Sequence, residues 1–529
     1  MIRKILSILL TAAVATACFE DKGNYNYHEI DRVTISGIDE LYPKTAYVDV
    51  LTIEPEIRSV INASTYSFLW TIHKELTTSW GDYSSIKTDT IGTERILNYP
   101  VNRKSGRYTV ILRVTNNESG LETYHTTTLE VTTQFSRGFY LLKDKQGATD
   151  LDIHLPGGEV IGDVLELSLG SPILEKPISL GLNPVYSYVN EKAAYEVASV
   201  LTLCTEQDVR ILKIEDMSVI YDHVSMFFGE VPSDRPVYAS FNTFGMLYMS
   251  SEGCFFSMQA PEWGMYGAGK FGYPAIVDDN GPDMGCSPNG NALNAASSFF
   301  FFDEKNGRFL QCDFNGGMHI YSDLNASNQP MPYNPNGITY KLKYLGLERI
   351  TTAHYGYAVF EDPTLPGKHY LYNIYLSGWD YSNPILSVTT VPSGSLLNQA
   401  TIMATNELTV RVIYFVTGNK LYMYDCSTNS EELLNLSGTA ADEEITFVKN
   451  LYWTYSKEQA EYRMDHLVVA TYKAGHYKVY LYNMTGGKPN GAPVKLLEGD
   501  GGRIRQVQYI SPRMDSSTDM YYPLSNISF

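Results

Sequence analysis

A strand–turn–strand unit that recurs from Gly138 onward constrains the fold of this chain more than any other feature. Its clearest copy is RVIYFVTGNKLYMYD (411–425), in which two apolar runs flank a glycine-containing turn. This pattern predicts a β-hairpin. Six further copies, some of them looser, lie at 139–155, 200–214, 245–258, 299–314, 357–376 and 467–483. The first and last turns, near Gly147 and Gly475, give a mean spacing of about 55 residues, which indicates a repeat architecture.

The best-defined copies have one more strand on each side. For the clearest hairpin these strands are NQATIMA (398–404) and EELLNL (431–436). Four antiparallel strands per repeat predict a β-propeller. The segment IRQVQYI (504–510) resembles a first strand with no hairpin after it, so we expect it to complete the first repeat and close the ring. We therefore predict an all-β chain with a propeller at 138–529. Seven blades fit best, and six or eight stay open because residues 150–245 are the least regular.

Residues 31–133 follow a different pattern, with short alternating strands separated by turn signals. Alternation of this kind predicts an antiparallel β-sandwich. Trp70 lies in the third expected strand, where an immunoglobulin-like sandwich usually buries a tryptophan. Tyr108 follows Gly106 at the start of a later strand, in the manner of a tyrosine corner. The region resembles a PKD-like domain, a fold that mostly serves as a spacer or docking module.

The first 22 residues, MIRKILSILLTAAVATACFEDK, have the pattern of an export signal. Arg3 and Lys4 precede an apolar run that is too short to span a bilayer, and small residues then lead into Cys18. The segment resembles the lipobox of bacterial lipoproteins, which implies a signal peptide at 1–17 and acylation of Cys18. Residues 18–30 would then form the lipidated N-terminus and a tether. An ordinary secretory signal, in which the cysteine is incidental, is the alternative interpretation.

Charge and cysteine content exclude several classes of protein. A formal net charge of −19 argues against nucleic acid and anionic polymers as partners, because these require a basic surface. The five cysteines after Cys18 are odd in number, widely spaced and without a CxxC motif. They therefore predict neither a disulfide framework nor a structural zinc site. Buried free thiols are the expected state, and a single disulfide stays open.

A search for catalytic and cofactor motifs finds none. The sequence contains no HExxH, GxSxG, P-loop, Rossmann or EF-hand pattern, so we expect no catalytic residue, no cofactor and no metal site. The insertion at 259–293 carries Asp278, Asp279 and Asp283. Their oxygens suit Ca²⁺ but lack the spacing of a calcium loop, so solvated carboxylates are the simpler interpretation.

Aromatic residues occur in loops that we expect on one face of the propeller. Trp263 and Tyr266 lie in the insertion, and Trp453 precedes the first strand of a hairpin. Trp379 and Tyr381 follow the second strand of another hairpin. Since successive strands alternate in direction, these loops fall on the face opposite the hairpin turns. An exposed aromatic cluster would suit sugar stacking or a protein partner, and tryptophans packed singly between blades are the alternative.

The lipobox, tether, sandwich and propeller together resemble the PKD-like surface lipoproteins of Bacteroidetes, and CFEDKGNYNYHEI (18–30) is very similar to their mature N-terminus. Glu20 and Asp21 resemble the tag that directs such lipoproteins to the outer face of the outer membrane. Members of this family tend to be encoded beside starch-utilisation-type uptake systems, which pair a TonB-dependent transporter with a lipoprotein lid. The resemblance implies a non-catalytic accessory lipoprotein that binds or presents a nutrient, glycan or peptide, to such a transporter.

Two other functions stay open. The 59 acidic residues allow many glycosidase-like carboxylate pairs, so a surface enzyme that degrades glycans or peptides with carboxylates on a propeller face is the alternative. A purely structural spacer is the third, although a propeller is more fold than a spacer needs.

Overall fold

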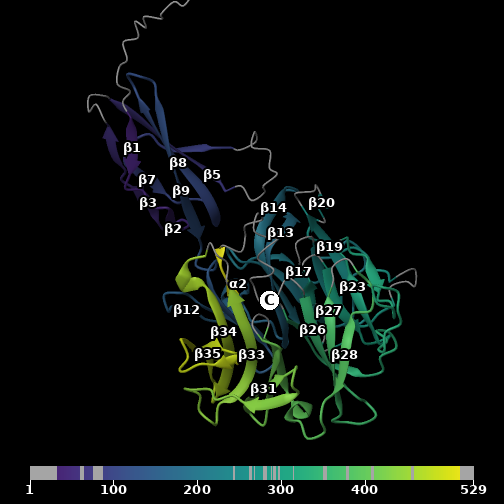
Figure 1. Ribbon diagram of the computed structural model, residues 1–529. Helices are drawn as coiled ribbons and strands as arrows, with labels where there is room; N and C mark the ends of the chain where they lie inside the picture. Colours follow the sequence, from purple (N-terminus) through teal and green to yellow (C-terminus); the bar gives the residue numbers. More distant parts are fainter. Residues whose placement is uncertain are drawn as a thin grey trace, which may run out of the picture.

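Strands make up nearly all of the regular structure, and a smaller body is followed along the chain by a larger one (Figure 1). The all-β class predicted from the sequence is confirmed. The computed structural model describes residues 32–59, 65–75, 87–241, 245–260, 265–266, 268–277, 283–287, 289, 293–295, 298–313, 315–348, 354–376, 380–406, 410–453 and 458–512. Helical structure within these ranges is limited to α2 (Val164–Leu169), η3 (Leu396–Gln399) and η4 (Ala460–Tyr462).

The smaller body packs a five-stranded sheet, in the order β2-β9-β8-β5-β6, against the strand pairs β1–β4 and β3–β7. The strand β2 runs parallel to β9, whereas the other neighbours are antiparallel. Every second residue of β8 is buried, as expected for a strand with one face on a core. The strands are β1 (Val33–Ser36), β2 (Leu41–Thr45), β3 (Val50–Ile53), β4 (Glu56–Ser59), β5 (Tyr66–Lys74), β6 (Asp89–Gly92), β7 (Leu97–Pro100), β8 (Gly106–Asn116) and β9 (Glu122–Thr132).

Two aromatic residues hold this body in the way the sequence predicts. Trp70 is fully buried between the sheets, and its indole N–H donates to the carbonyl of Glu94 at 3.0 Å. The Tyr108 hydroxyl donates to the carbonyl of Lys104, four residues upstream, at 2.9 Å. That bond is the hydrogen bond of a tyrosine corner, and it fixes the loop that leads into β8.

The larger body consists of seven antiparallel sheets that follow one another along the chain, six with four strands and the last with five. Each predicted hairpin supplies the two middle strands of one sheet. The first four sheets contain β10 (Gly138–Asp144), β11 (Thr149–His154), β12 (Val160–Ile161) with β38 (Arg503–Ile510); β13 (Pro177–Val189), β14 (Tyr195–Thr205), β15 (Val209–Lys213), β16 (Val219–Tyr221); β17 (Pro236–Phe241), β18 (Gly245–Ser250), β19 (Cys254–Ala260), β20 (Met265–Tyr266); and β21 (Leu293–Ala295), β22 (Ser298–Asp303), β23 (Arg308–Cys312), β24 (Met318–Ile320).

The last three sheets keep the same order. They contain β25 (Lys341–Glu348), β26 (His354–Glu361), β27 (His369–Leu376), β28 (Ile385–Thr390); β29 (Ile402–Thr405), β30 (Val412–Thr417), β31 (Lys420–Asp425), β32 (Ser430–Leu433); and β33 (Glu444–Trp453), β34 (Met464–Lys473), β35 (His476–Thr485), with β36 (Lys488–Pro489) and β37 (Lys495–Asp500) both paired to β35.

Turn chemistry explains why the hairpins are so visible in the sequence. Gly418 and Asn419, between β30 and β31, have φ of 53° and 59°, and Ala474 and Gly475, between β34 and β35, have φ of 51° and 95°. Two central residues with positive φ are typical of a type I′ turn, whose twist matches that of the flanking strands. Glycine and asparagine adopt this conformation readily, so they mark the turn in the sequence.

The middle strands are buried on both faces because each sheet is packed between two neighbours. All six residues of β22, SFFFFD, are buried. Phe302 of this strand meets Phe360 of β26, in the next sheet, with ring centroids 4.8 Å apart. A strand covered on both sides has a continuous apolar run instead of an alternating one, and this is the pattern of the clear repeats.

The least regular stretch of the repeat has two structural causes. The helix α2 follows the outer strand of the first sheet, and β13 and β14 are 13 and 11 residues long. Their pairing also shifts register between Asn183 and Tyr186. A longer and bulged hairpin hides the repeat from a search for short, regular strands.

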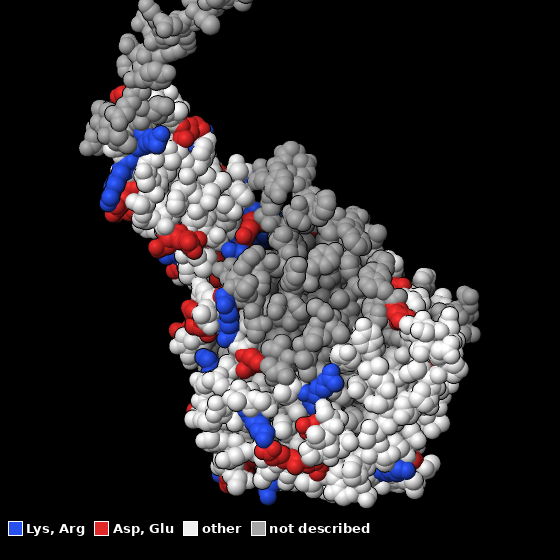
Figure 2. All heavy atoms as spheres, viewed as in Figure 1, with Lys and Arg blue, Asp and Glu red and all other residues white. Residues whose placement is uncertain are grey.

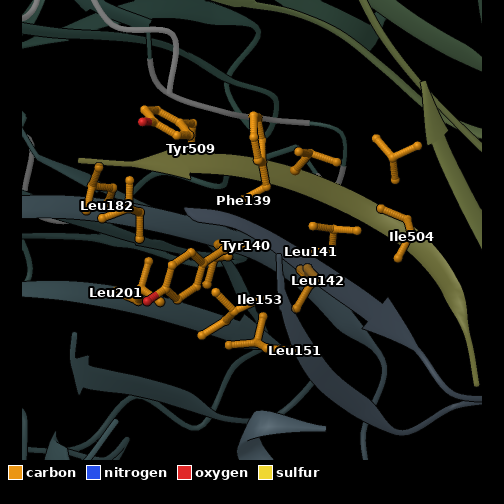
Figure 3. Close-up of a cluster of buried hydrophobic side chains, with 14 of the residues drawn as sticks. Phe139, Tyr140, Leu141, Leu142, Leu151, Ile153, Leu182, Leu201, Ile504 and Tyr509 are labelled. Carbon is orange, nitrogen blue, oxygen red and sulfur yellow. The ribbon is translucent and has the colours of Figure 1, made fainter. Parts of the chain in front are cut away.

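The C-terminal strand β38 pairs with β10 from the other end of the larger body, with Gly138 opposite Ile510 and Asp144 opposite Arg503. Figure 3 shows Ile504 and Tyr509 on this strand beside Phe139 and Leu141 on the first hairpin. These side chains belong to one buried cluster that also draws residues from the last and second sheets. The first sheet is therefore assembled from both ends of the larger body.

We expect Val507→Asp to disrupt this closure. Val507 is fully buried opposite Leu141, so the variant places an unpaired carboxylate in the core and should lower the free energy of unfolding by about 4 kcal/mol or more. Chemical denaturation measures the loss. Arg505→Ala on the same strand is the control, because Arg505 is exposed and the variant should lose only its ion pair with Asp144, a smaller loss than a carboxylate buried in the core. Equal losses for the two variants would contradict this role of β38.

Candidate interdomain binding cleft

Arg137 joins the two bodies through one guanidinium group. It lies between β9 of the smaller body and β10 of the larger one, and its side chain is only 10% exposed. One nitrogen lies 3.2 Å from Glu130 of β9, and the other lies 3.3 Å from Glu458, which follows β33. The guanidinium also donates to the Tyr509 hydroxyl at 3.3 Å and stacks over the Tyr462 ring at 4.0 Å.

Glu458 is the second centre of this contact. Its carboxylate accepts hydrogen bonds from the Trp453 indole at 2.9 Å and from the Ser511 hydroxyl. Burial alone would raise the pKa of Glu458, but Arg137 and these donors hold it below its ordinary value of 4.5. The carboxylate is therefore ionised at neutral pH, as a partner for a buried arginine must be.

A cleft of about 540 Å³ lies beside this contact, between the end of the smaller body and the second sheet. The smaller body contributes the end of β5, the β7–β8 loop and the start of β8, and the larger body contributes β13, β14, β15 and the end of β38. The lining residues are Lys74, Asn102, Arg103, Lys104, Ser105, Gly106, Tyr108, Ser136, Pro184, Val197, Ala198, Ser199, Lys213, Ile214, Glu215, Ile510, Ser511 and Pro512. Most of the polar side chains are hydroxyls, amines or an amide.

Cations outnumber carboxylates in the lining, since Lys74, Arg103, Lys104 and Lys213 face one Glu215. Arg103 is already paired with Asp89 at 2.8 Å. Lys213 lies 3.1 Å from Glu215; burial would lower its pKa, but this carboxylate raises it above the ordinary value. The amine therefore stays charged at neutral pH. Figure 2 shows side chains of both charge signs where the smaller body meets the larger one.

One wall of the cleft is held by a second contact between the two bodies. Lys104 of the β7–β8 loop lies 3.6 Å from Glu196 of β14. Hydrogen bonds from Tyr188 and Asn190 lower the pKa of Glu196 to about 2, with a smaller contribution from Lys104. The carboxylate is thus ionised and oriented before the lysine meets it. Because Lys104 is 63% exposed, this pair is a weak link that positions the loop more than it stabilises it.

The predicted aromatic site residues differ in whether the structure describes them and in where they lie. Trp263 and Trp379, like Cys18, lie outside the described residues, and Tyr266 lies in β20. Tyr381 is half-buried and stacks on His319 with ring centroids 4.1 Å apart.

Trp453 differs from the expectation of an exposed aromatic residue. It is 1% exposed, because it packs in the core between the first, second and last sheets and donates its N–H to Glu458. Its position therefore matches the alternative of a tryptophan packed in the interior, and it contributes to the Arg137 contact instead of a binding face.

The structure describes one of the three aspartates in the predicted acidic cluster. Asp278 and Asp279 lie outside the described residues, and Asp283 is exposed and pairs with Lys305 at 2.5 Å. Among the residues that the structure describes, no group of three His, Cys, Asp or Glu side chains could hold a metal ion. In the same residues, no helix is long and apolar enough to cross a membrane.

Sequence reasoning missed the cleft. Its charged residues come from the smaller body and from the second sheet, more than a hundred residues apart, and they join no motif. The one local signal was the tyrosine corner, which fixes the β7–β8 loop that carries Arg103 and Lys104. That signal indicated a rigid loop but could not indicate what lies opposite it.

Comparison with known proteins gives one family match and several distant structural likenesses. Residues 18–177, less than a third of the chain, match the model of the PKD-like family. The search of curated proteins gives no match. A quinonprotein alcohol dehydrogenase-like protein from Bacteroides thetaiotaomicron is 12% identical, with 91% of this chain and 99% of that chain covered and a TM-score of 0.39.

Two other solved structures are still more distant. A DUF4784 family protein from Bacteroides caccae is 7% identical, with 76% of this chain and 95% of that chain covered and a TM-score of 0.32. Dipeptidyl peptidase 4 from Porphyromonas gingivalis is 11% identical, with 69% and 54% covered and a TM-score of 0.28. Likenesses at these TM-scores carry no inference about the activity of this chain.

Arg137→Ala should lower the free energy of unfolding by about 3–5 kcal/mol, because it leaves Glu130 and Glu458 buried without their cation. Chemical denaturation measures the loss, and limited proteolysis at 133–138 should show faster cleavage between the two bodies. Arg58→Ala is the control, since Arg58 and its partner Glu56 are 79% and 63% exposed. A loss no larger than that of the control would contradict this role of Arg137.

The stability of the chain should also depend on the ionisation of Glu458. Because the folded-state pKa lies below the ordinary value of 4.5, the contribution of this group is complete above that value and is lost as the pH falls through the folded-state pKa. Glu458→Gln cannot titrate, so its melting temperature should fall less steeply with acidification below about pH 5 than that of the wild type. Parallel profiles for the two proteins would contradict the assignment.

Proposed function

We propose that this chain is an accessory surface lipoprotein that binds or presents a nutrient, glycan or peptide, in a TonB-dependent uptake complex, without catalysis. In this proposal a sandwich at 31–133 carries a β-propeller at 138–529, whose blades are the seven sheets. The observation that carries the proposal is the interdomain cleft. Its walls come from both bodies, and the Arg137 contact fixes one body against the other.

The chemistry of the cleft supports a polar ligand. Boundaries between domains are frequent ligand sites, and a volume of about 540 Å³ is within the usual size of such pockets. The Ser105 hydroxyl suits hydrogen bonding to a sugar or a peptide backbone. The Ser199 hydroxyl donates to the carbonyl of Pro184 at 2.8 Å and can still accept a hydrogen bond from a ligand. Lys74 and Lys213 suit a carboxylate, as a uronic acid or a peptide C-terminus would supply.

The family match supports the anchor. The match to the PKD-like family model begins at residue 18, which is the residue that cleavage at the lipobox would expose. Acylation of Cys18 would place the sandwich between the membrane and the larger body, with the chain on the outer membrane and facing the exterior. The partners in this proposal are the TonB-dependent transporter and its lipoprotein lid.

The loop aromatics belong to the proposal as a second contact region. Trp263, Tyr266, Trp379 and Tyr381 would meet the ligand or the transporter complex, whereas the buried Trp453 would not. The cleft and this region are separable by mutation, since they share no residue.

The test combines capture and binding. The tagged lipoprotein, isolated from outer membranes, should bring down a transporter–lid pair. Isothermal titration with galacturonate oligosaccharides, neutral gluco-oligosaccharides, and oligopeptides with free or amidated C-termini should give binding to a carboxylate-bearing series and weaker binding to its neutral counterpart. Capture of no transporter in repeated experiments, together with no binding in any series, would refute the proposal.

Lys74→Ala and Lys213→Ala should each weaken that binding about tenfold, the usual loss when a charge-assisted hydrogen bond is removed. Lys420→Ala is the matched control, because Lys420 is an exposed lysine at a hairpin of the larger body and does not line the cleft. Unchanged affinity in both cleft variants would place the ligand elsewhere, and capture by Trp263→Ala and Trp379→Ala proteins would then test the aromatic region.

A further inference from the structure

Two of the buried cysteines lie next to each other. The Sγ atoms of Cys254 and Cys286 are 3.6 Å apart, and the two residues are 0% and 6% exposed. They belong to an apolar cluster between the third and fourth sheets, together with Val277, Met284 and Phe299. Cys312 lies in the same cluster, but its thiol is directed to the carbonyl of Asp313 at 3.7 Å.

We propose that Cys254 and Cys286 form a disulfide in the exported protein. The bond would connect the start of β19 to the segment before β21. It would therefore cross-link the third sheet to the segment that leads into the fourth. Hydrogen bonds donated by main-chain N–H groups hold the chain in place at or next to each cysteine. Ala275 donates to the carbonyl of Cys254 at 2.8 Å, and Gly285 donates to the Asp303 carboxylate at 2.9 Å.

The change of geometry that the bond requires is small. A disulfide has an S–S distance of about 2.0 Å, so the sulfurs must approach by about 1.6 Å. Rotation about χ1 of one cysteine moves its sulfur over distances of this size. An apolar cluster accepts a disulfide as readily as two thiols, since neither state carries charge.

The reaction is a thiol–disulfide exchange with an oxidised dithiol partner, such as a periplasmic disulfide oxidase. The thiolate of one cysteine attacks the disulfide of the partner and forms a mixed disulfide. The thiolate of the other cysteine then displaces the partner, which leaves as a dithiol with two electrons and two protons taken from the chain.

Burial dictates the order of events. Burial, and then the hydrogen bond with Cys286, raises the pKa of the Cys254 thiol well above its ordinary value. Thiolate is therefore scarce in the folded chain, and exchange requires thiolate. The bond must form before the third and fourth sheets pack together, and it is then protected from reductants by the same burial. The proposal depends on the export proposed above, and it does not depend on ligand binding in the cleft.

The experiment alkylates the chain from outer membranes with iodoacetamide in denaturant, without reductant, and identifies the peptides by mass spectrometry. The expected result is one linked peptide pair that contains Cys254 and Cys286 and weighs two hydrogens less than the separate peptides, whereas Cys204, Cys312 and Cys426 are alkylated. In Cys254→Ser, Cys286 should become fully alkylated. Full alkylation of all five cysteines in the wild type would overturn the proposal.

A second arm separates the geometry from export. The reduced chain is unfolded and refolded in a glutathione redox buffer, and the same peptides are analysed. The linked pair should appear in the wild type, and no other pair should appear in Cys286→Ser. A linked pair in the refolded chain but not in the membrane-derived chain would overturn the disulfide in the native protein, whereas failure of ligand binding alone would leave this result unchanged.

Discussion

The antiparallel pairing of β38 with β10 is the interaction on which the rest of this structure depends. It joins segments more than 350 residues apart, and its register places Gly138 opposite Ile510. The residues just outside the paired region, Arg137 and Ser511, therefore emerge at the same point. Glu458 lies there as well, and it contacts both of them. Closure of the larger body thus builds the contact that holds the smaller body, and the end of β38 becomes a wall of the cleft.

The ionic character of that contact has a cost and a use. Removing charges from water is expensive, and a well-packed apolar junction of the same size would be as stable or more stable. Charged groups, however, accept only partners in the right geometry. Arg137 must meet Glu130, Glu458 and Tyr509 together, so few relative positions of the two bodies satisfy it. We interpret the contact as a device that selects one orientation, and the acid dependence predicted for Glu458 follows from the same design.

Much of the fold could be predicted from the sequence because local physics determines it. Apolar runs and turn residues revealed all seven hairpins, and the unpaired pattern at 504–510 indicated the closing strand. The roles of Trp70 and Tyr108 could be predicted because each belongs to a motif with a fixed spacing. The cleft could not be predicted from the sequence, because it forms only where the β7–β8 loop lies against β14 in the folded chain. Trp453 was predicted to be exposed for a related reason, because nothing in the sequence indicates that its indole N–H pairs with the buried Glu458.

A fixed junction also determines what kind of site the cleft can be. When a ligand binds between two hinged bodies, part of the binding free energy is lost to the entropy of closing the hinge. Between bodies whose relative position is fixed during folding, this loss does not occur on binding. Its shape is then set by the loop from Tyr99 to Tyr108, held by the tyrosine corner, and by Glu196, held by Tyr188 and Asn190. In the function proposed above, a site of this kind would select ligands by fit and charge without a change in the relative position of the two bodies. That behaviour suits a protein that presents a ligand to another, because a presented ligand must keep a constant position relative to the surface that carries it.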